Sequence, residues 1–219
     1  MKQLLITLTL FAFVACEQAP KADKASITTA QTVQAGTGQA YIPDTANSLV
    51  EWIGTKPTGK HHGSIKLAGG AIYVKDSTVT GGNITINMLT LQNLDLAADT
   101  AMKNKLETEL KGPQFFDVQH FPTATFEITE ITPYEPARDG EVTLAHATHI
   151  VKGNFTLRGV VKNITFPAHI AIDNHGVTTT ANFNIDRTKW GITYRADKSL
   201  QDKLINSQVN ISFRLKAVR

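Results

Sequence analysis

The residues best suited to chemistry in this chain are its seven histidines and its single cysteine, Cys16. Two histidine pairs are close in sequence, His61 with His62 and His146 with His149. Same-face residues of a strand are two apart, so neither pair converges on a metal ion if these segments are strands. One cysteine excludes an intramolecular disulfide, a zinc cluster of cysteines and a CxxC redox pair. The sequence therefore predicts no metal and no cofactor.

Motifs of common enzyme classes are missing, because the chain contains no GxSxG, HExxH or P-loop pattern. Its net charge of +3 comes from Lys and Arg residues that are scattered rather than grouped into a basic stripe. The electrostatic signature of a nucleic-acid-binding surface is therefore absent. We predict a protein that is not an enzyme and does not bind nucleic acid. A hydrolytic dyad assembled from distant residues stays open as an alternative.

The beginning of the chain has the pattern of a targeting segment. Residues 4–14 form an apolar run that is too short to span a bilayer permanently. The stretch FVAC, residues 13–16, resembles a bacterial lipobox, in which the cysteine becomes the acylated first residue of the mature chain. We therefore predict a signal peptide over residues 1–15 and a membrane anchor at Cys16. This makes the protein a periplasm-facing lipoprotein of the bacterial cell envelope, and Glu17 favours the outer membrane.

Residues 16–43 consist mainly of Ala, Gln, Thr, Lys and Gly, with few large apolar side chains. Such a composition buries too little apolar surface to offset the entropy lost on ordering. It predicts a flexible linker that follows the acylated cysteine and holds a folded domain close to the membrane. The folded domain is expected over residues 44–219.

Within this domain the hydrophobic pattern has a period of two, which is typical of half-buried strands. At the C-terminus, for example, Ile211, Phe213 and Leu215 alternate with polar residues. Turn signals separate about eight such segments, near residues 48–56, 63–75, 78–90, 123–132, 141–158, 162–173, 176–186 and 208–219. A mainly β fold results, and we predict an eight-stranded antiparallel β-barrel.

The segment AADTAMKNKLETEL, residues 97–110, departs from this pattern because its apolar residues have helical spacing. Asp99 or Thr100 can cap its start, and Gly112 with Pro113 ends it. Four of the chain's ten phenylalanines follow at positions 115, 116, 121 and 126. We predict one short inserted helix whose aromatic exit plugs or rims an opening of the barrel.

The strands have one apolar face, which can turn into the barrel or, in an outer-membrane barrel, out towards lipid. Charged residues in the middle of strands, such as Lys162, Arg214 and Lys216, occupy the opposite face. They favour the inward orientation of the apolar face. The number of strands does not decide whether the interior is filled by side chains or holds one small ligand.

Four stretches of the chain together resemble the YceI-like family of bacterial periplasmic and lipoprotein domains. They are LVEWIGTKPTGKHHG, KLETELKGPQFFDVQHFPTATFEI, VKGNFTLRGVVKNITFPAHI and FNIDRTKWGITY, in the family's order and spacing, and the resemblance covers residues 41–219. It implies a lipocalin-like barrel whose elongated apolar cavity binds polyisoprenoid or other long-chain amphiphilic lipids, with no established catalytic centre. The chain departs from the family at Glu109, where histidine is common, and at Asn87, where aspartate is common.

On the basis of this resemblance we expect a lipid pocket and two contacts to the lipid headgroup. The pocket candidates are Trp52, Met88, Met102, Leu106, Leu110, Phe115, Phe116, Phe121, Phe126, Trp190 and Tyr194. For the phenylalanines ordinary core packing is the alternative, and the two tryptophans could equally be rim anchors. His61, in the family's PTGxHxG motif, could bind a phosphate or carboxyl end, or cap a turn. Arg187 could bind the same headgroup through two hydrogen bonds, or form an ion pair at the end of a strand with Asp186 or a neighbour.

The predicted function is therefore to bind, and carry or store, a long-chain isoprenoid or related amphiphilic lipid in the cell envelope. A non-catalytic envelope stress or interaction module, with the barrel as a scaffold, is the first alternative, and an enzyme that acts on lipid is the second. The sequence leaves open the identity of the lipid and the oligomeric state, with a homodimer as one option.

Overall fold

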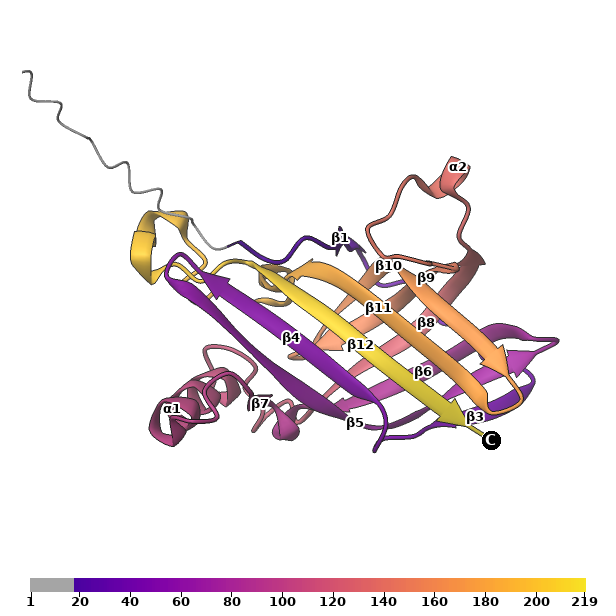
Figure 1. Ribbon diagram of the computed structural model, residues 1–219, viewed down its shortest axis with the longest axis horizontal. Helices are drawn as coiled ribbons and strands as arrows, with labels where there is room; N and C mark the ends of the chain where they lie inside the picture. Colours follow the sequence, from indigo (N-terminus) through magenta and orange to yellow (C-terminus); the bar gives the residue numbers. More distant parts are fainter. Residues whose placement is uncertain (1–17) are drawn as a thin grey trace, which may run out of the picture.

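The computed structural model describes residues 18–219, except the side chains of Lys198 and Asp202, and shows an elongated β-barrel (Figure 1). Its long strands are β4 (Leu49–Lys56), β5 (Gly59–Lys75), β6 (Thr78–Asn87), β8 (Thr123–Pro133), β9 (His149–Leu157), β10 (Val160–Asp173), β11 (Gly176–Asp186) and β12 (Gln208–Val218). Each pairs antiparallel with the next along the chain, and β12 pairs with β4. This last pairing closes the barrel, and the predicted fold class is confirmed.

The apolar face of each strand turns into the barrel. On β12, Leu215 is buried and Phe213 packs against the core. Arg214 and Lys216, which alternate with them, are exposed. On β11, Phe183 is buried in the same way. The inward orientation, which the charged mid-strand residues favoured, is therefore the one that the structure adopts.

One end of the barrel is filled by its own side chains. This is the end with the β5–β6 hairpin, β3 (Gln39–Pro43) and the C-terminus (Figure 1). Its buried residues include Tyr41, Ile72, Val74, Val177 and Ala217. The cross-strand pairs Tyr41 with Ile72 and Val177 with Ala217 bring these side chains together. We call this the closed end.

The helix α1 (Thr100–Lys111) lies at the other end of the barrel, beside the short strand β7 (Gln92–Asn93) (Figure 1). The Asp99 carboxylate caps the helix by accepting a hydrogen bond from Met102 N. Glu107 attaches the helix to the barrel because its carboxylate accepts from Asn93 N at 2.8 Å. The predicted helix is confirmed, with Asp99 rather than Thr100 as its cap.

The remaining elements are short. They are β1 (Asp23–Lys24), β2 (Ser26–Thr28), α2 (Pro136–Asp139) and the 3-10 helices η1 (Met88–Thr90), η2 (Arg187–Trp190) and η3 (Lys198–Lys203). Residues 141–148, which the sequence placed at the start of a strand, precede β9 instead. No helix within residues 18–219 is long and apolar enough to cross a membrane.

The N-terminal segment differs from the flexible linker expected over residues 16–43. Its described part, from Gln18 onwards, lies along the barrel. β1 pairs in parallel with β11, β2 pairs antiparallel with β10, and β3 pairs with β5 and β12. We call residues 18–43 the strap, and the expectation of a flexible linker is corrected for this part of the chain.

Asparagine side chains on the outside of the barrel explain why the strap is ordered. Asn154, which is buried, accepts a hydrogen bond from Gln31 N at 2.9 Å and donates one to Gln31 O at 2.7 Å. Asn184 donates to Pro20 O at 2.9 Å. Much of the strap therefore docks through its backbone, and Ile27 and Tyr41 are the large apolar side chains that it adds to the core.

Arg187, at the start of η2, fixes the segment that joins β11 to β12. Its buried guanidinium donates from Nε to Asn206 O, from Nη1 to Ile192 O, and from Nη2 to Tyr194 O and Ile205 O, at 2.6–3.1 Å. Burial lowers the pKa of Arg187, which the nearby Asp186 opposes. One charged side chain thus binds four backbone carbonyls of residues 192–206 to the end of the barrel.

We predict that Asn154→Ala destabilises the protein by about 2–3 kcal/mol, since it removes both hydrogen bonds to Gln31 and one of the two that Asn163 Nδ2 donates. Urea denaturation followed by circular dichroism measures the change. Asn104→Ala, on the exposed side of α1, is the matched control and should shift the free energy of unfolding by less than about 0.5 kcal/mol. Equal stability of the two variants would show that the hydrogen bonds between Asn154 and the strap do not stabilise the fold.

A second prediction concerns Arg187→Lys, which keeps the charge but loses the planar guanidinium. An ammonium group cannot reach four carbonyls, so the free energy of unfolding should fall by about 2–4 kcal/mol. Amide hydrogen exchange over residues 192–206 should also become faster. Arg214→Lys, at an exposed position of β12, serves as the control. Unchanged exchange in Arg187→Lys would contradict a role in fixing this segment.

Candidate ligand-binding cavity

A cavity of about 440 Å³ occupies the barrel between the closed end and α1. This volume lies within the range typical of small-molecule sites. The deeper part of the wall is aliphatic or aromatic, and includes Ile65, Leu67, Ile86, Ala124, Leu157, Ile164, Ile185, Val209, Ile211 and Leu215. The inward faces of the barrel strands supply these residues. Such a wall suits a ligand with a long hydrocarbon part.

Phenylalanines from neighbouring strands form one side of the cavity. Phe166 on β10 stacks on Phe183 of β11, with ring centroids 4.2 Å apart and ring planes at 16°. Phe126 on β8 and Phe213 on β12 contact Phe166 at 5.6 and 6.0 Å. All four line the cavity. Sequence reasoning named only Phe126 as a site residue, although the other three occupy inward positions of its own strand pattern.

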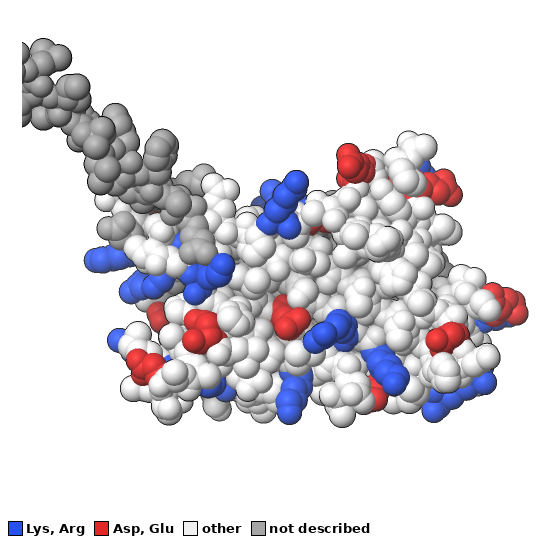
Figure 2. Space-filling model, viewed as in Figure 1, with Lys and Arg blue, Asp and Glu red and all other residues white. Residues whose placement is uncertain are grey.

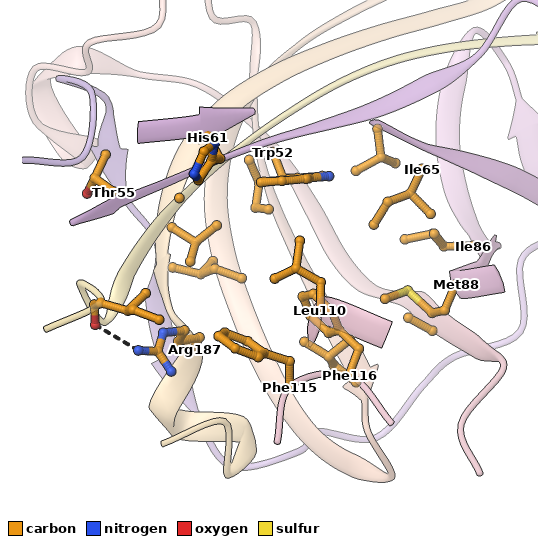
Figure 3. A pocket seen from close by; sticks show the side chains of 18 of the residues that line it. Trp52, Thr55, His61, Ile65, Ile86, Met88, Leu110, Phe115, Phe116 and Arg187 are labelled. Atoms are coloured by element: carbon orange, nitrogen blue, oxygen red, sulfur yellow. Dashed lines mark hydrogen bonds between the residues drawn. The ribbon is translucent and has the colours of Figure 1, made fainter. Parts of the chain in front are cut away.

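Trp52 lines the cavity from β4, the strand that pairs with β12, and lies between His61 and Ile65 (Figure 3). The neighbouring glycine makes room for it, because a Cβ atom at Gly63 would lie 2.5 Å from Trp52 Cζ2 and 1.9 Å from Gln92 O. Within the described part of the chain, Trp52 Nε1 is the one buried side-chain nitrogen or oxygen without a hydrogen-bond partner. An unpaired buried donor costs about 1–3 kcal/mol, so the indole ring is held here by packing.

The helix and the residues after it cover the cavity from another side. Leu110, Phe115 and Phe116 lie opposite Trp52 (Figure 3). A turn after α1 aims both rings, because Phe115 N donates to Gly112 O and Phe116 N donates to Leu110 O, each at 3.1 Å. This arrangement matches the predicted aromatic exit from the helix.

Eight of the predicted pocket residues line the cavity. They are Trp52, Met88, Met102, Leu106, Leu110, Phe115, Phe116 and Phe126. Their contact with a lipid stays a prediction.

Three predicted pocket residues are not part of the cavity wall. Trp190 is fully buried, and its Nε1 donates to Phe155 O at 3.1 Å. Phe121 packs over the turn at Gly159, where its ring occupies the place of a Cβ atom. Tyr194 makes an edge contact with Phe115 at 5.4 Å. Each ring packs against other parts of the protein, which corrects the expectation that these three residues line the pocket.

Of the two predicted headgroup contacts, His61 lines the cavity and interacts with Asp95 at 2.8 Å through Nδ1. Asp95 also accepts from His62 N at 2.8 Å and from Asn93 Nδ2 at 2.6 Å. Desolvation opposes ionisation of Asp95, but these hydrogen bonds hold the pKa of its carboxyl group below the usual value. Asp95 therefore orients the His61 ring, and His61 Nε2 makes no hydrogen bond within the described residues.

Arg187 also lines the cavity, but its guanidinium already binds four backbone carbonyls. A headgroup bound through two hydrogen bonds would have to break some of these, so the expected bidentate contact is corrected to a structural role. The expected alternative, an ion pair with Asp186, is not formed either, since that carboxylate accepts from Thr188 N and Oγ1. The guanidinium instead lies 5.7 Å from the centre of the Phe115 ring.

Charged side chains border the cavity where it reaches the surface. Lys56, Lys105, Arg195 and Lys203 line it there, and Glu109 is the one carboxylate among its described lining residues. Lys105, Arg195 and Lys203 are exposed, as is Met102. We call this opening, beside α1 and η3, the mouth. Within residues 18–219, no three His, Cys, Asp or Glu side chains converge to hold a metal ion.

Comparisons with solved structures identify relatives of the same fold. BcnA from Burkholderia cenocepacia has 19% sequence identity and a TM-score of 0.60, over 79% of this chain and 98% of that chain. A polyisoprenoid binding domain from Saccharophagus degradans, implicated in plant cell wall breakdown, has 14% identity and a TM-score of 0.58, over 81% of this chain and 97% of that chain. At these identities the likeness shows the fold alone.

A comparison with curated protein sequences finds no match. The family described as YceI-like domain matches the sequence over residues 41–217. This stretch includes all eight long strands of the barrel except Val218, the last residue of β12, and every residue that lines the cavity. The chain therefore belongs to the YceI-like domain family.

Proposed function

We propose that this protein binds a long-chain amphiphilic lipid of the isoprenoid type inside its barrel, and carries or stores the lipid in the bacterial cell envelope. The observation that carries the proposal is the apolar cavity of the barrel. The barrel is packed with side chains at its closed end, and the cavity reaches the surface at the mouth. A chain-shaped ligand can enter such a cavity lengthwise. Its polar end then stays at the mouth, close to His61.

Hydrocarbon burial alone supplies enough free energy for such binding. Each CH₂ group removed from water contributes about 0.8 kcal/mol. A lipid with about twenty buried carbons therefore gains about 16 kcal/mol in total, against a cost of association and ordering of roughly 4–15 kcal/mol. The structural relative from Saccharophagus degradans, which is described as a polyisoprenoid binding domain, supports the choice of lipid class.

The proposed location rests on the N-terminal sequence. The signal peptide over residues 1–15 and the acylated Cys16 lie outside the described residues. A lipid-modified Cys16 would anchor the protein to the membrane and leave the barrel in the periplasm, with the outer membrane preferred. A membrane-anchored barrel is well placed to exchange lipid with the bilayer to which it is attached.

We expect that organic-solvent extraction of the natively purified protein releases a long-chain lipid, because the apolar cavity favours a hydrocarbon ligand over water. Mass spectrometry of the extract identifies the lipid and its ratio to protein. An extract without lipid, together with a partner captured by crosslinking, would support an interaction module instead. Turnover of an added lipid ester, followed by chromatography, would support an enzyme.

Reducing the cavity should reduce the amount of bound lipid. Val209 lines the cavity, so Val209→Trp places a large ring inside it. Val161→Trp adds the same ring at an exposed position of β10 and is the matched control. The lipid-to-protein ratio should fall several-fold in Val209→Trp and stay unchanged in Val161→Trp, provided that thermal unfolding shows both variants to be folded. An unchanged ratio in both would place the lipid outside the barrel.

A further inference from the structure

Exposed apolar side chains surround the mouth. Leu94 before α1, Met102 on α1 and Leu200 on η3 have exposed fractions of 41%, 50% and 38%. They are three of the seven large apolar side chains that are exposed in the described part of the chain. They mark a surface that is suited to an apolar partner.

Basic side chains accompany these apolar residues. Lys105, Arg195 and Lys203 are exposed at the mouth, and Glu109 lines the cavity beside them. The exposed carboxylates next to the apolar residues, those of Asp95, Asp99 and Asp197, each accept a hydrogen bond from a backbone N–H. Lys and Arg gather at the η3 end of the face in Figure 2. Apolar and basic side chains on one surface match the two layers of an anionic bilayer, its hydrocarbon and its phosphate headgroups.

The position of the N-terminus gives a third, independent observation. The strap is fixed along the barrel by β1 and β2, and its first residues lie near the mouth, because Asn184 binds Pro20 O. Asn184 is only three residues before Arg187, which lines the cavity. The described chain accordingly begins at the end of the barrel that carries η3 (Figure 1).

We propose that the mouth docks on an anionic lipid bilayer, with Leu94, Met102 and Leu200 at the level of the acyl chains and Lys105 and Lys203 at the phosphates. The cavity then opens onto the membrane, and a lipid passes between bilayer and barrel without exposing its hydrocarbon chain to water. The proposal rests on the proposed function for the nature of the passing molecule, but the docking itself is tested separately.

Fluorescence quenching by brominated lipid tests the orientation. The full chain is expressed in a bacterium, so that any N-terminal processing takes place, and is mixed with vesicles of phosphatidylglycerol and phosphatidylcholine brominated in the acyl chains. Leu200→Trp places a reporter at the mouth. Ile42→Trp places one at the closed end, where Ile42 is opposite Val218 and 52% exposed. The quenching of the wild-type protein, with its buried Trp52 and Trp190, is subtracted.

We expect additional quenching in Leu200→Trp and none in Ile42→Trp. Adding Lys203→Ala to Leu200→Trp should raise the concentration of anionic lipid needed for half of the quenching about fivefold, whereas Lys75→Ala, at the closed end, should not change it. Equal quenching of both reporters, or of neither, would overturn the proposal. A change in Leu200→Trp fluorescence that depends on protein concentration without vesicles would also overturn it, since a second copy would then cover the mouth.

The two proposals can fail separately. If docking is wrong but the proposed function is right, lipid is still present in the extract of the purified protein while the two reporters behave alike. If the proposed function is wrong but docking is right, the extract contains no lipid while only the reporter at the mouth is quenched.

Discussion

The volume enclosed by the barrel is the constraint on which the rest of the structure depends. Eight strands enclose a space that inward side chains can just fill, so the interior becomes core or cavity according to the residues present at each level. At the closed end, Tyr41 and Ile72 meet and leave a packed core. Towards α1 the flat faces of Phe166 and Phe183 lie against each other along the wall. Stacked in this way, the rings leave the central space open, and α1 covers it from outside.

A cavity of this kind needs a mouth that neither collapses nor seals, and the structure meets this requirement with polar interactions rather than more hydrophobic packing. Arg187 binds four carbonyls of residues 192–206, which holds this segment in place although few of its side chains are buried. Asp95 holds His61 in a similar way. Directional hydrogen bonds fix these segments at the edge of the opening, whereas apolar side chains would tend to fill it.

Features of this structure that depend on interactions between residues close in sequence could be predicted, whereas features that depend on distant residues could not. Strand alternation and the Asp99 cap depend on neighbours in sequence, so the barrel and α1 could be predicted. Aromatic content alone could not distinguish residues of the cavity wall from residues that pack elsewhere. Trp190 is an example, because its indole donates a hydrogen bond to the carbonyl of Phe155, 35 residues away, and the ring does not line the cavity. The inward positions of Phe166, Phe183 and Phe213 were a better signal than the aromatic-rich stretch, since strand period fixes the direction of a side chain. The hydrogen bonds of Arg187 to four carbonyls could not be predicted, because they depend on the conformation of a loop, which leaves no periodic pattern in the sequence.

The strap was missed for a related reason, and the cause lies in the outer face of the barrel. Asparagine is disfavoured in strands, yet Asn154, Asn163, Asn184 and Asn210 occupy outward positions of β9 to β12. In the sequence, polar residues at these positions indicate a face that is exposed to solvent. In the structure, the strap covers this face. Asn154 binds a residue 123 positions away, and Asn210 donates to Asn182 and to Asn184, which itself holds the strap at Pro20. The asparagines thus offset their poor strand propensity by binding a second layer of backbone. This layer is what fixes the N-terminal end of the described chain beside the mouth rather than leaving its position to a flexible linker.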